Sequence, residues 1–109
     1  GMQLVDGTIA IASCPDHVEE AQILAGQVAD YLVTIKEIRA SFLFYQTDKG
    51  LCLSARSDGS VNVQVVMEAL GGGGHLTVAG AQLGKEGNKE SAEKVIIAQV
   101  RKQIKEEKE

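Results

Sequence analysis

The stretch GGGGHLTVAG, residues 71–80, organises the rest of this chain, because it separates an apolar segment of helical character from one of strand character. Four consecutive glycines have no side chains to pack, and ordering them costs more backbone entropy than ordering any other residue type. Their amides can form a concave nest for an anion, with His75 beside it. The alternative is a flexible connector that begins with a glycine cap. One glycine suffices for a cap and two for a turn, so the run of four favours a phosphate-binding loop.

Composition limits the classes of protein to which the chain can belong. Its 109 residues are 44% hydrophobic, which suits one domain with a modest core. No apolar run has the length of a membrane span, so we expect no membrane contact by this domain. The two cysteines lack the spacing of a disulfide framework, which favours a reducing, cytoplasmic compartment. The net charge of −4 argues against a basic face for duplex nucleic acid. The sequence predicts neither a disulfide framework nor a metal site, because its cysteines and histidines are few and scattered (Cys14, Cys52, His17 and His75).

Hydrophobic periodicity predicts a single α/β domain with a mixed sheet of about four strands and helices packed on its faces. Asp16 and Glu19 have capping-box spacing before the first helix, and Asn88 can cap the last one. The expected elements are a strand at 7–13, a helix opening near Pro15 and reaching Leu32, a hairpin of strands 38–46 and 51–56, a helix at 61–70, a strand at 76–83, and a helix after Asn88 that frays from residue 105. In 38–46 the alternation predicts one strongly buried face.

The segment 61–70 is ambiguous between helix and strand. Its β-branched residues and early alternation favour a strand. Val63, Val66, Met67 and Leu70 have helical spacing, and the segment lies between a capping Ser60 and a glycine. We therefore predict a helix.

The glycine run differs from the common phosphate-binding motifs, which place glycines after a strand and before a helix. Here the order is reversed, so no following helix N-terminus assists the loop and a nearby cation is needed. Arg56, at the end of strand 51–56, is the natural cation, because its planar guanidinium can bind a phosphate with two hydrogen bonds. Ser54 can add a hydroxyl, and Asn62 can contact a nucleotide or only cap its helix. For Arg56 the alternative is an ordinary surface arginine. His75 can donate to a phosphate oxygen or act on a leaving group.

The residues 54–57 (SARS), 61–63 (VNV), 71–75 (GGGGH) and 79–80 (AG) resemble the C-terminal substrate-binding domain of the DHH phosphoesterase family, often called the DHH-associated domain. The resemblance extends from the first strand to the last helix. The stretch from Val61 to Thr77 is most similar to the membrane-tethered cyclic-di-AMP phosphodiesterases of Gram-positive bacteria, the GdpP type. Ala79-Gly80-Ala81 is nearer the general family pattern.

Gly1-Met2 is expected to be a remnant of cloning, which would make the chain a piece of a longer protein. The resemblance implies that residues 3–109 are the substrate-binding domain of a longer phosphodiesterase. An N-terminal DHH domain of the same protein would hold two manganese ions, and this fragment would hold none and be inactive alone. The parent protein would hydrolyse cyclic di-AMP, could form a homodimer, and could be anchored in the cell membrane. Carried over to this chain, the phosphate contacts are Arg56 and His75, the backbone contacts are Gly72, Gly73 and Gly74, and Ser54 and Asn62 extend the site.

Three alternatives remain open from the sequence. The same domain occurs in nanoRNase and RecJ-like nucleases, whose substrates are oligonucleotides. The chain could also be a regulatory nucleotide-binding module without catalysis, or a structural domain in which the glycines only connect two elements. A shared phosphate site makes one geometric demand: strand 76–83 must run antiparallel to 51–56, so that Arg56 and His75 lie at the same end of the sheet.

Overall fold

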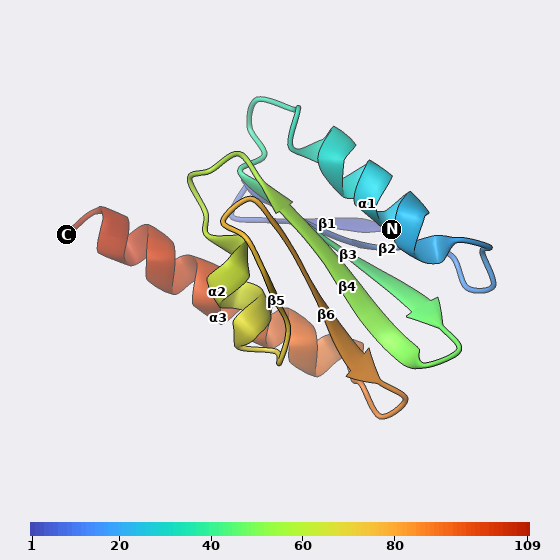
Figure 1. Cartoon of the computed structure of the whole chain (residues 1–109). Coiled ribbons are helices and arrows are strands. Elements are labelled where there is room, and N and C mark those ends of the chain that lie inside the picture. Colours follow the sequence, from blue (N-terminus) through green and yellow to red (C-terminus); the bar gives the residue numbers. More distant parts are fainter.

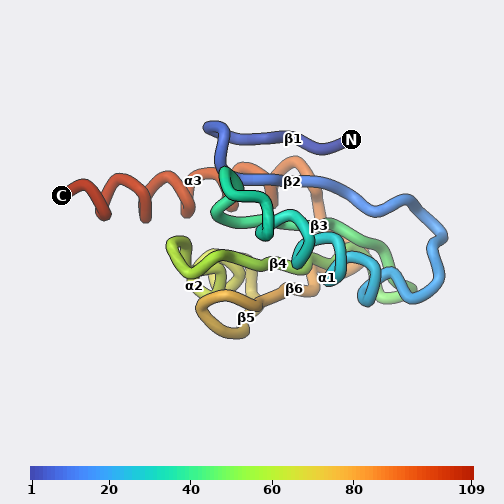
Figure 2. Tube along the Cα trace, turned by 90° about the horizontal axis from the view of Figure 1, so that it is seen from above, coloured from blue at the N-terminus to red at the C-terminus, as the bar shows by residue number.

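The computed structural model describes all 109 residues and consists of one six-stranded sheet with three helices. The elements in chain order are β1 Met2–Val5, β2 Ile9–Ser13, α1 Ala21–Leu32, β3 Ala40–Thr47, β4 Gly50–Ser57, α2 Val63–Glu68, β5 Gly73–Gly74, β6 Val78–Gly84 and α3 Lys89–Glu107. The strand order is β1-β2-β3-β4-β6-β5, which Figure 2 shows from one edge of the sheet to the other. Only β2 and β3 pair in parallel, with α1 as their crossover. The predicted α/β class and mixed sheet are confirmed.

The sheet has two more strands than predicted, and both are edge strands. β1 pairs with β2 through a tight turn in which Asp6 and Gly7 have positive φ values of 53° and 74°. β5 consists of two glycines of the loop, which pair with Gly80 and Ala79 of β6. Glycine has low strand propensity, so this pairing is imposed by the neighbouring strand rather than by local sequence.

Helices cover both faces of the sheet (Figure 1). α2 and α3 pack on one face, where Phe42, Phe44 and Leu53 are fully buried. α1 packs on the other face over Leu43 and Tyr45, and Ser41 donates a 2.8 Å hydrogen bond to the carbonyl of Ala29 in α1. The expectation of one strongly buried face in β3 is therefore incomplete, because this central strand is buried on both sides. The predicted central position of the β3–β4 hairpin is confirmed.

The start of α1 differs from the prediction. The helix begins at Ala21, not near Pro15, because His17 and Glu20 adopt left-handed backbone conformations that a helix excludes. The N-cap residue is Glu20, and its side chain makes no capping hydrogen bond. The capping box of Asp16 and Glu19 is therefore not formed, since both residues lie in turns.

The other helices and β6 follow the prediction with shifted ends. α2 is a helix, but its cap is Asn62, whose Oδ1 accepts a hydrogen bond from the amide of Val65 at 3.3 Å; the Ser60 hydroxyl instead donates to Asp58. Asn88 caps α3 as predicted. α3 continues through Glu107, where an ion pair of 2.7 Å with Arg39 holds the last turn that was expected to fray. β6 starts at Val78, because residues 76 and 77 form a bend.

None of the helices combines the length and the apolar character that crossing a membrane requires.

Candidate functional site

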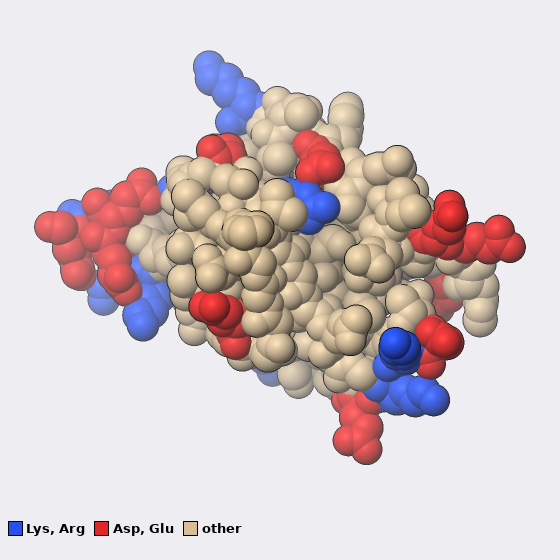
Figure 3. Space-filling view, viewed as in Figure 1, with Lys and Arg blue, Asp and Glu red and all other residues tan.

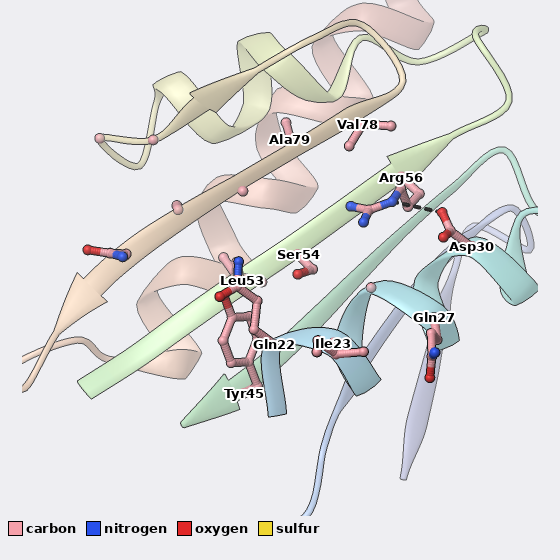
Figure 4. Close-up of a pocket in the computed structure, with 16 residues that line it drawn as sticks. Gln22, Ile23, Gln27, Asp30, Tyr45, Leu53, Ser54, Arg56, Val78 and Ala79 are labelled. Carbon is pink, nitrogen blue, oxygen red and sulfur yellow. Dashed lines mark hydrogen bonds and ion pairs between the residues drawn. The ribbon is translucent and has the colours of Figure 1, made fainter. Parts of the chain in front are cut away.

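The candidate site is a cleft between α1 and the β4–β6 half of the sheet. α1 packs on β2 and β3 and reaches Cys52 of β4, so the same face of the sheet stays open beyond it. The cleft has a volume of about 830 Å³ and is lined by α1, β4, β6 and the first two glycines of the loop (Figure 4). In the β4–β6 register Ser54 lies opposite Gly80 and Arg56 opposite Val78, so these four residues share the cleft face. Gly80 adds no side chain to this face beside Ser54.

Arg56 is the cation of this cleft. Its side chain is 18% exposed, its Nε donates to Asp30 Oδ1 at 2.8 Å, and its Nη1 donates to the carbonyl of Ala55 at 3.0 Å. Nη2 has no acceptor within the chain. The guanidinium is therefore held from one side, and its remaining N–H groups are available to an anion.

Charge is sparse around the cleft. Figure 3 shows a largely uncharged surface over β4 and β6, with Lys, Arg, Asp and Glu gathered towards the ends of the molecule. Arg56 and Asp30 are the charged residues among those that line the cleft. An anion would therefore be attracted by Arg56 locally rather than by the charge of the whole domain, which is −4.

Two hydroxyl groups lie deeper in the cleft. Ser54 is 7% exposed and projects from β4 between Leu53 and Ala55 towards the α1 side. Tyr45 of β3 is also 7% exposed, and burial raises the pKa of its phenol above the ordinary value. Tyr45 therefore stays neutral at pH 7, and both groups can donate a hydrogen bond to a bound polar ligand.

The glycine run has a mainly structural geometry. Gly71 has φ of 82° and its amide donates to the carbonyl of Glu68, while the amide of Gly72 donates to the carbonyl of Met67 at 2.8 Å. This is a Schellman motif that closes α2, so these two amides are not free to bind an anion. A Cβ on Gly72 would lie 2.1 Å from the carbonyl oxygen of Gly80, and one on Gly74 would lie 2.5 Å from Cα of Ala79. Gly73 differs, because a Cβ there would meet nothing within 4 Å.

The structure brings Ser54, Arg56 and Gly72 together in the cleft, but it does not place the other predicted residues there. Asn62 caps α2, and its backbone amide and carbonyl bond to the side chain of Gln103 in α3, on the other face of the sheet. His75 is exposed in the turn between β5 and β6, beyond the end of the cleft. Gly73 and Gly74 form the edge strand β5.

The predicted strand direction is confirmed. β4 and β6 are antiparallel, and Arg56 lies opposite Val78, whose carbonyl accepts a 2.7 Å hydrogen bond from the amide of His75. Arg56 and His75 are therefore at the same end of the sheet, as a shared phosphate site requires. Contact of both with one phosphate remains a prediction.

Several lining residues were not predicted from the sequence. α1 contributes Ile23, Gly26 and Asp30, and exposed glutamine side chains lie along the walls at Gln22, Gln27 and Gln82. Gly26 could have been found from the sequence, because an isolated glycine within a regular helical pattern indicates close packing against another group. Nothing in the sequence pairs Asp30 with Arg56, since they are 26 positions apart.

Metal ions do not fit the residues of this chain. No group of three or more His, Cys, Asp or Glu side chains is arranged to hold one. The two manganese ions implied by the resemblance would need ligands from another domain.

Comparison with known proteins identifies the family. The DHHA1 domain model matches residues 6–102, nearly the whole chain. The chain belongs to the DHHA1 family, the domain that accompanies the DHH domain in DHH phosphoesterases.

Several relatives of this chain are named cyclic-di-AMP phosphodiesterases. Cyclic-di-AMP phosphodiesterase GdpP of Bacillus subtilis (strain 168) is 52% identical over 83 residues, which cover 73% of this chain and 13% of the relative. Cyclic-di-AMP phosphodiesterase PdeA of Listeria monocytogenes (serotype 1/2a, strain 10403S) is 39% identical over 100 residues, which cover 91% of this chain and 15% of the relative. The chain therefore spans a small part of these proteins.

A solved structure supports the fold alone. An exopolyphosphatase-related protein from Bacteroides fragilis aligns with a TM-score of 0.71 at 23% identity, over 93% of this chain and 31% of that one.

Proposed function

We propose that this domain binds the nucleotide substrate of a phosphodiesterase that hydrolyses cyclic di-AMP. The observation that carries the proposal is Arg56, whose unpartnered Nη2 is held in an otherwise nearly uncharged cleft. The identity to GdpP and PdeA supports cyclic di-AMP rather than a long nucleic acid. The negative net charge agrees with a small anionic ligand bound at one local cation.

The polar residues of the cleft would bind the phosphate of the nucleotide, and the apolar residues would contact its ring. Arg56 would donate charge-assisted hydrogen bonds to phosphate oxygens, and the Ser54 hydroxyl would add a neutral donor. Ile23 and Val78 are 54% and 44% exposed, and Figure 4 shows them on the two sides of the Arg56 guanidinium. These exposed apolar side chains would pack against the base of a nucleotide whose phosphate is bound by Arg56.

The chemistry of hydrolysis would reside elsewhere in the parent protein. A DHH domain preceding this one would hold two manganese ions, which would supply the metal-activated chemistry of hydrolysis. This domain would orient the phosphate and offset its charge, without a catalytic group of its own. The resemblance to the membrane-tethered type extends the proposal to a membrane-anchored parent with this domain in the cytoplasm.

Binding can be tested by calorimetry and NMR on the 109-residue chain, with cyclic di-AMP and 5′-AMP as probes. We expect saturable binding, with amide shifts at residues of β4, β6 and α1 that line the cleft. Arg56→Ala should weaken binding by about tenfold to a hundredfold, because a hydrogen bond to a charged group contributes about 1.5–3 kcal/mol.

Arg101→Ala is the matched control, since it removes the same charge from an ion-paired arginine outside the cleft. Its affinity for both probes should stay within about twofold of the wild type, the size of a long-range charge effect at physiological salt. Equal losses in the two variants, or no binding by the wild-type chain, would refute a phosphate site at Arg56.

A further inference from the structure

Two residues of α1 that contact Arg56 are unfavourable choices for the helix itself. Gly26 lies in the middle of α1, where glycine is less stable than alanine. Asp30 lies in the last turn, where the helix dipole disfavours a negative charge. They are four positions apart and so lie on one face of the helix. Asp30 bonds to the guanidinium of Arg56, and a Cβ at position 26 would lie 2.9 Å from its Nη2, which accounts for both residues at positions that α1 alone does not favour.

We propose that Gly26 and Asp30 are positioning residues that set the orientation of Arg56 for its anionic ligand, an inference that rests on the proposed function. Asp30 fixes the Nε side of the guanidinium at 2.8 Å, and the carbonyl of Ala55 fixes Nη1 at 3.0 Å. Gly26 leaves room for Nη2, since a Cβ at this position would lie 2.9 Å from that atom. Nη2 is thereby held beside Gly26, at the lining of the cleft, as the one guanidinium nitrogen without an acceptor in the chain.

The arrangement lowers the entropy that Arg56 loses when it binds an anion. A free arginine side chain loses rotamer freedom on binding, whereas one that is already held loses little. Asp30 is 64% exposed, so its carboxylate is solvated and its charge weakens the attraction of Arg56 for an anion only partly. Asp30 therefore raises the affinity of Arg56 for an anion by orienting the guanidinium and lowers it by its negative charge. Variants at Asp30 can separate these two effects.

Three variants of the 109-residue chain test the proposal, with 5′-AMP as the probe. Asp30→Ala removes both the charge and the acceptor for Nε, and should weaken binding by about threefold to tenfold, the cost of ordering one long side chain. Asp30→Asn keeps an acceptor and removes the charge, and should strengthen binding by about twofold at low salt. Asp48→Asn, in the β3–β4 turn outside the cleft, is the control for the loss of one negative charge.

Gly26→Ala gives a test in which stability and binding change in opposite directions. The added methyl meets the end of a flexible side chain, so Arg56 moves aside and the fold is kept. The melting temperature should rise by about 2–6 °C, because alanine favours the helix. Affinity for 5′-AMP should fall by about threefold or more, as Nη2 is displaced.

A spectroscopic readout distinguishes positioning from a general structural effect. The Nε–H signal of Arg56 in NMR spectra should be sharp and slow to exchange in the wild type and in Asp30→Asn, and should be lost or averaged in Asp30→Ala. Unchanged affinity in Gly26→Ala, or stronger binding in both Asp30 variants, would overturn the positioning role. If Arg56→Ala also binds 5′-AMP like the wild type, the proposed function itself fails; if only Arg56→Ala loses binding, the proposed function stands without this inference.

Discussion

Replacing Gly72 by alanine introduces a methyl group where the backbone of β6 leaves no room. The Cβ would lie 2.1 Å from the carbonyl oxygen of Gly80, 2.7 Å from Cβ of Ala81 and 2.8 Å from its Cα. These atoms belong to the backbone or are fixed to it, so no rotamer change can relieve the contacts. The loop and β6 would have to separate, which also strains the Schellman motif that ends at the Gly72 amide.

The size of the effect follows from the kind of contact that is made. Overpacking in a well-packed interior costs about 1–3 kcal/mol, and a contact with backbone belongs at the upper end of that range. For a domain of this size a loss of about 3 kcal/mol lowers the melting temperature by roughly 10–20 °C. Urea denaturation followed by circular dichroism at 222 nm would measure the loss directly, as a lower midpoint with an unchanged slope.

Gly73→Ala is the matched control one residue away. A Cβ on Gly73 meets nothing within 4 Å, and Gly73 is not among the glycines with positive φ. Alanine should therefore be tolerated or stabilise the domain by about 0.4–1 kcal/mol, through the entropy of the unfolded chain. Equal urea midpoints for the two variants would refute the packing argument for Gly72. Lower affinity for 5′-AMP in Gly73→Ala without lower stability would indicate that ligand approach requires this glycine.

Two further predictions concern single side chains. Asn62→Ala should lower the free energy of unfolding by about 1 kcal/mol through loss of the α2 cap, and Asn88→Ala should do the same at α3. Urea denaturation measures both losses. A loss of 5′-AMP affinity in Asn62→Ala alone would instead assign Asn62 to the binding site. The hydrogen bonds from Arg101 lower the pKa of Asp6, so their contribution to stability is present above the unfolded pKa and lost as pH falls through the folded one. The wild type should therefore exceed Asp6→Asn in stability near pH 7, and the difference should vanish in acid; a difference that persists at pH 2 would contradict this.

Patterns that depend on near neighbours in the chain were predictable. The periodicity of α3 and its Asn88 cap, the β3–β4 hairpin and the helical spacing in 61–70 all act over a few residues, and the structure contains each of them. Arg56 was predictable as a cation because it ends the predicted strand next to a loop, and Ser54 was predictable as a nearby hydroxyl donor; the structure shows that the two share one face of β4. The antiparallel direction of β6 followed from requiring Arg56 and His75 at one end of the sheet.

Errors arose where local patterns compete with tertiary contacts. The spacing of Asp16 and Glu19 resembles a capping box, but the left-handed residues His17 and Glu20 keep this segment out of the helix. The last turn of α3 was expected to fray, but Arg39, far away in sequence, forms an ion pair with Glu107. β1 was missed because three of its four residues are exposed and show no clear alternation.

The glycine run shows most clearly what the sequence and the structure each contribute. The sequence by itself indicated that residues 71–74 join a helix to a strand, because glycine is unfavourable in the interior of both elements. Only the tertiary structure decided why each glycine is there: Gly71 closes α2, Gly72 and Gly74 lie against β6, and Gly73 is open to the surroundings. It also decided that Arg56 faces a cleft beside Gly26 and Asp30. Such contacts join elements distant in the chain, so they depend on how α1 and the sheet pack and not on any local pattern.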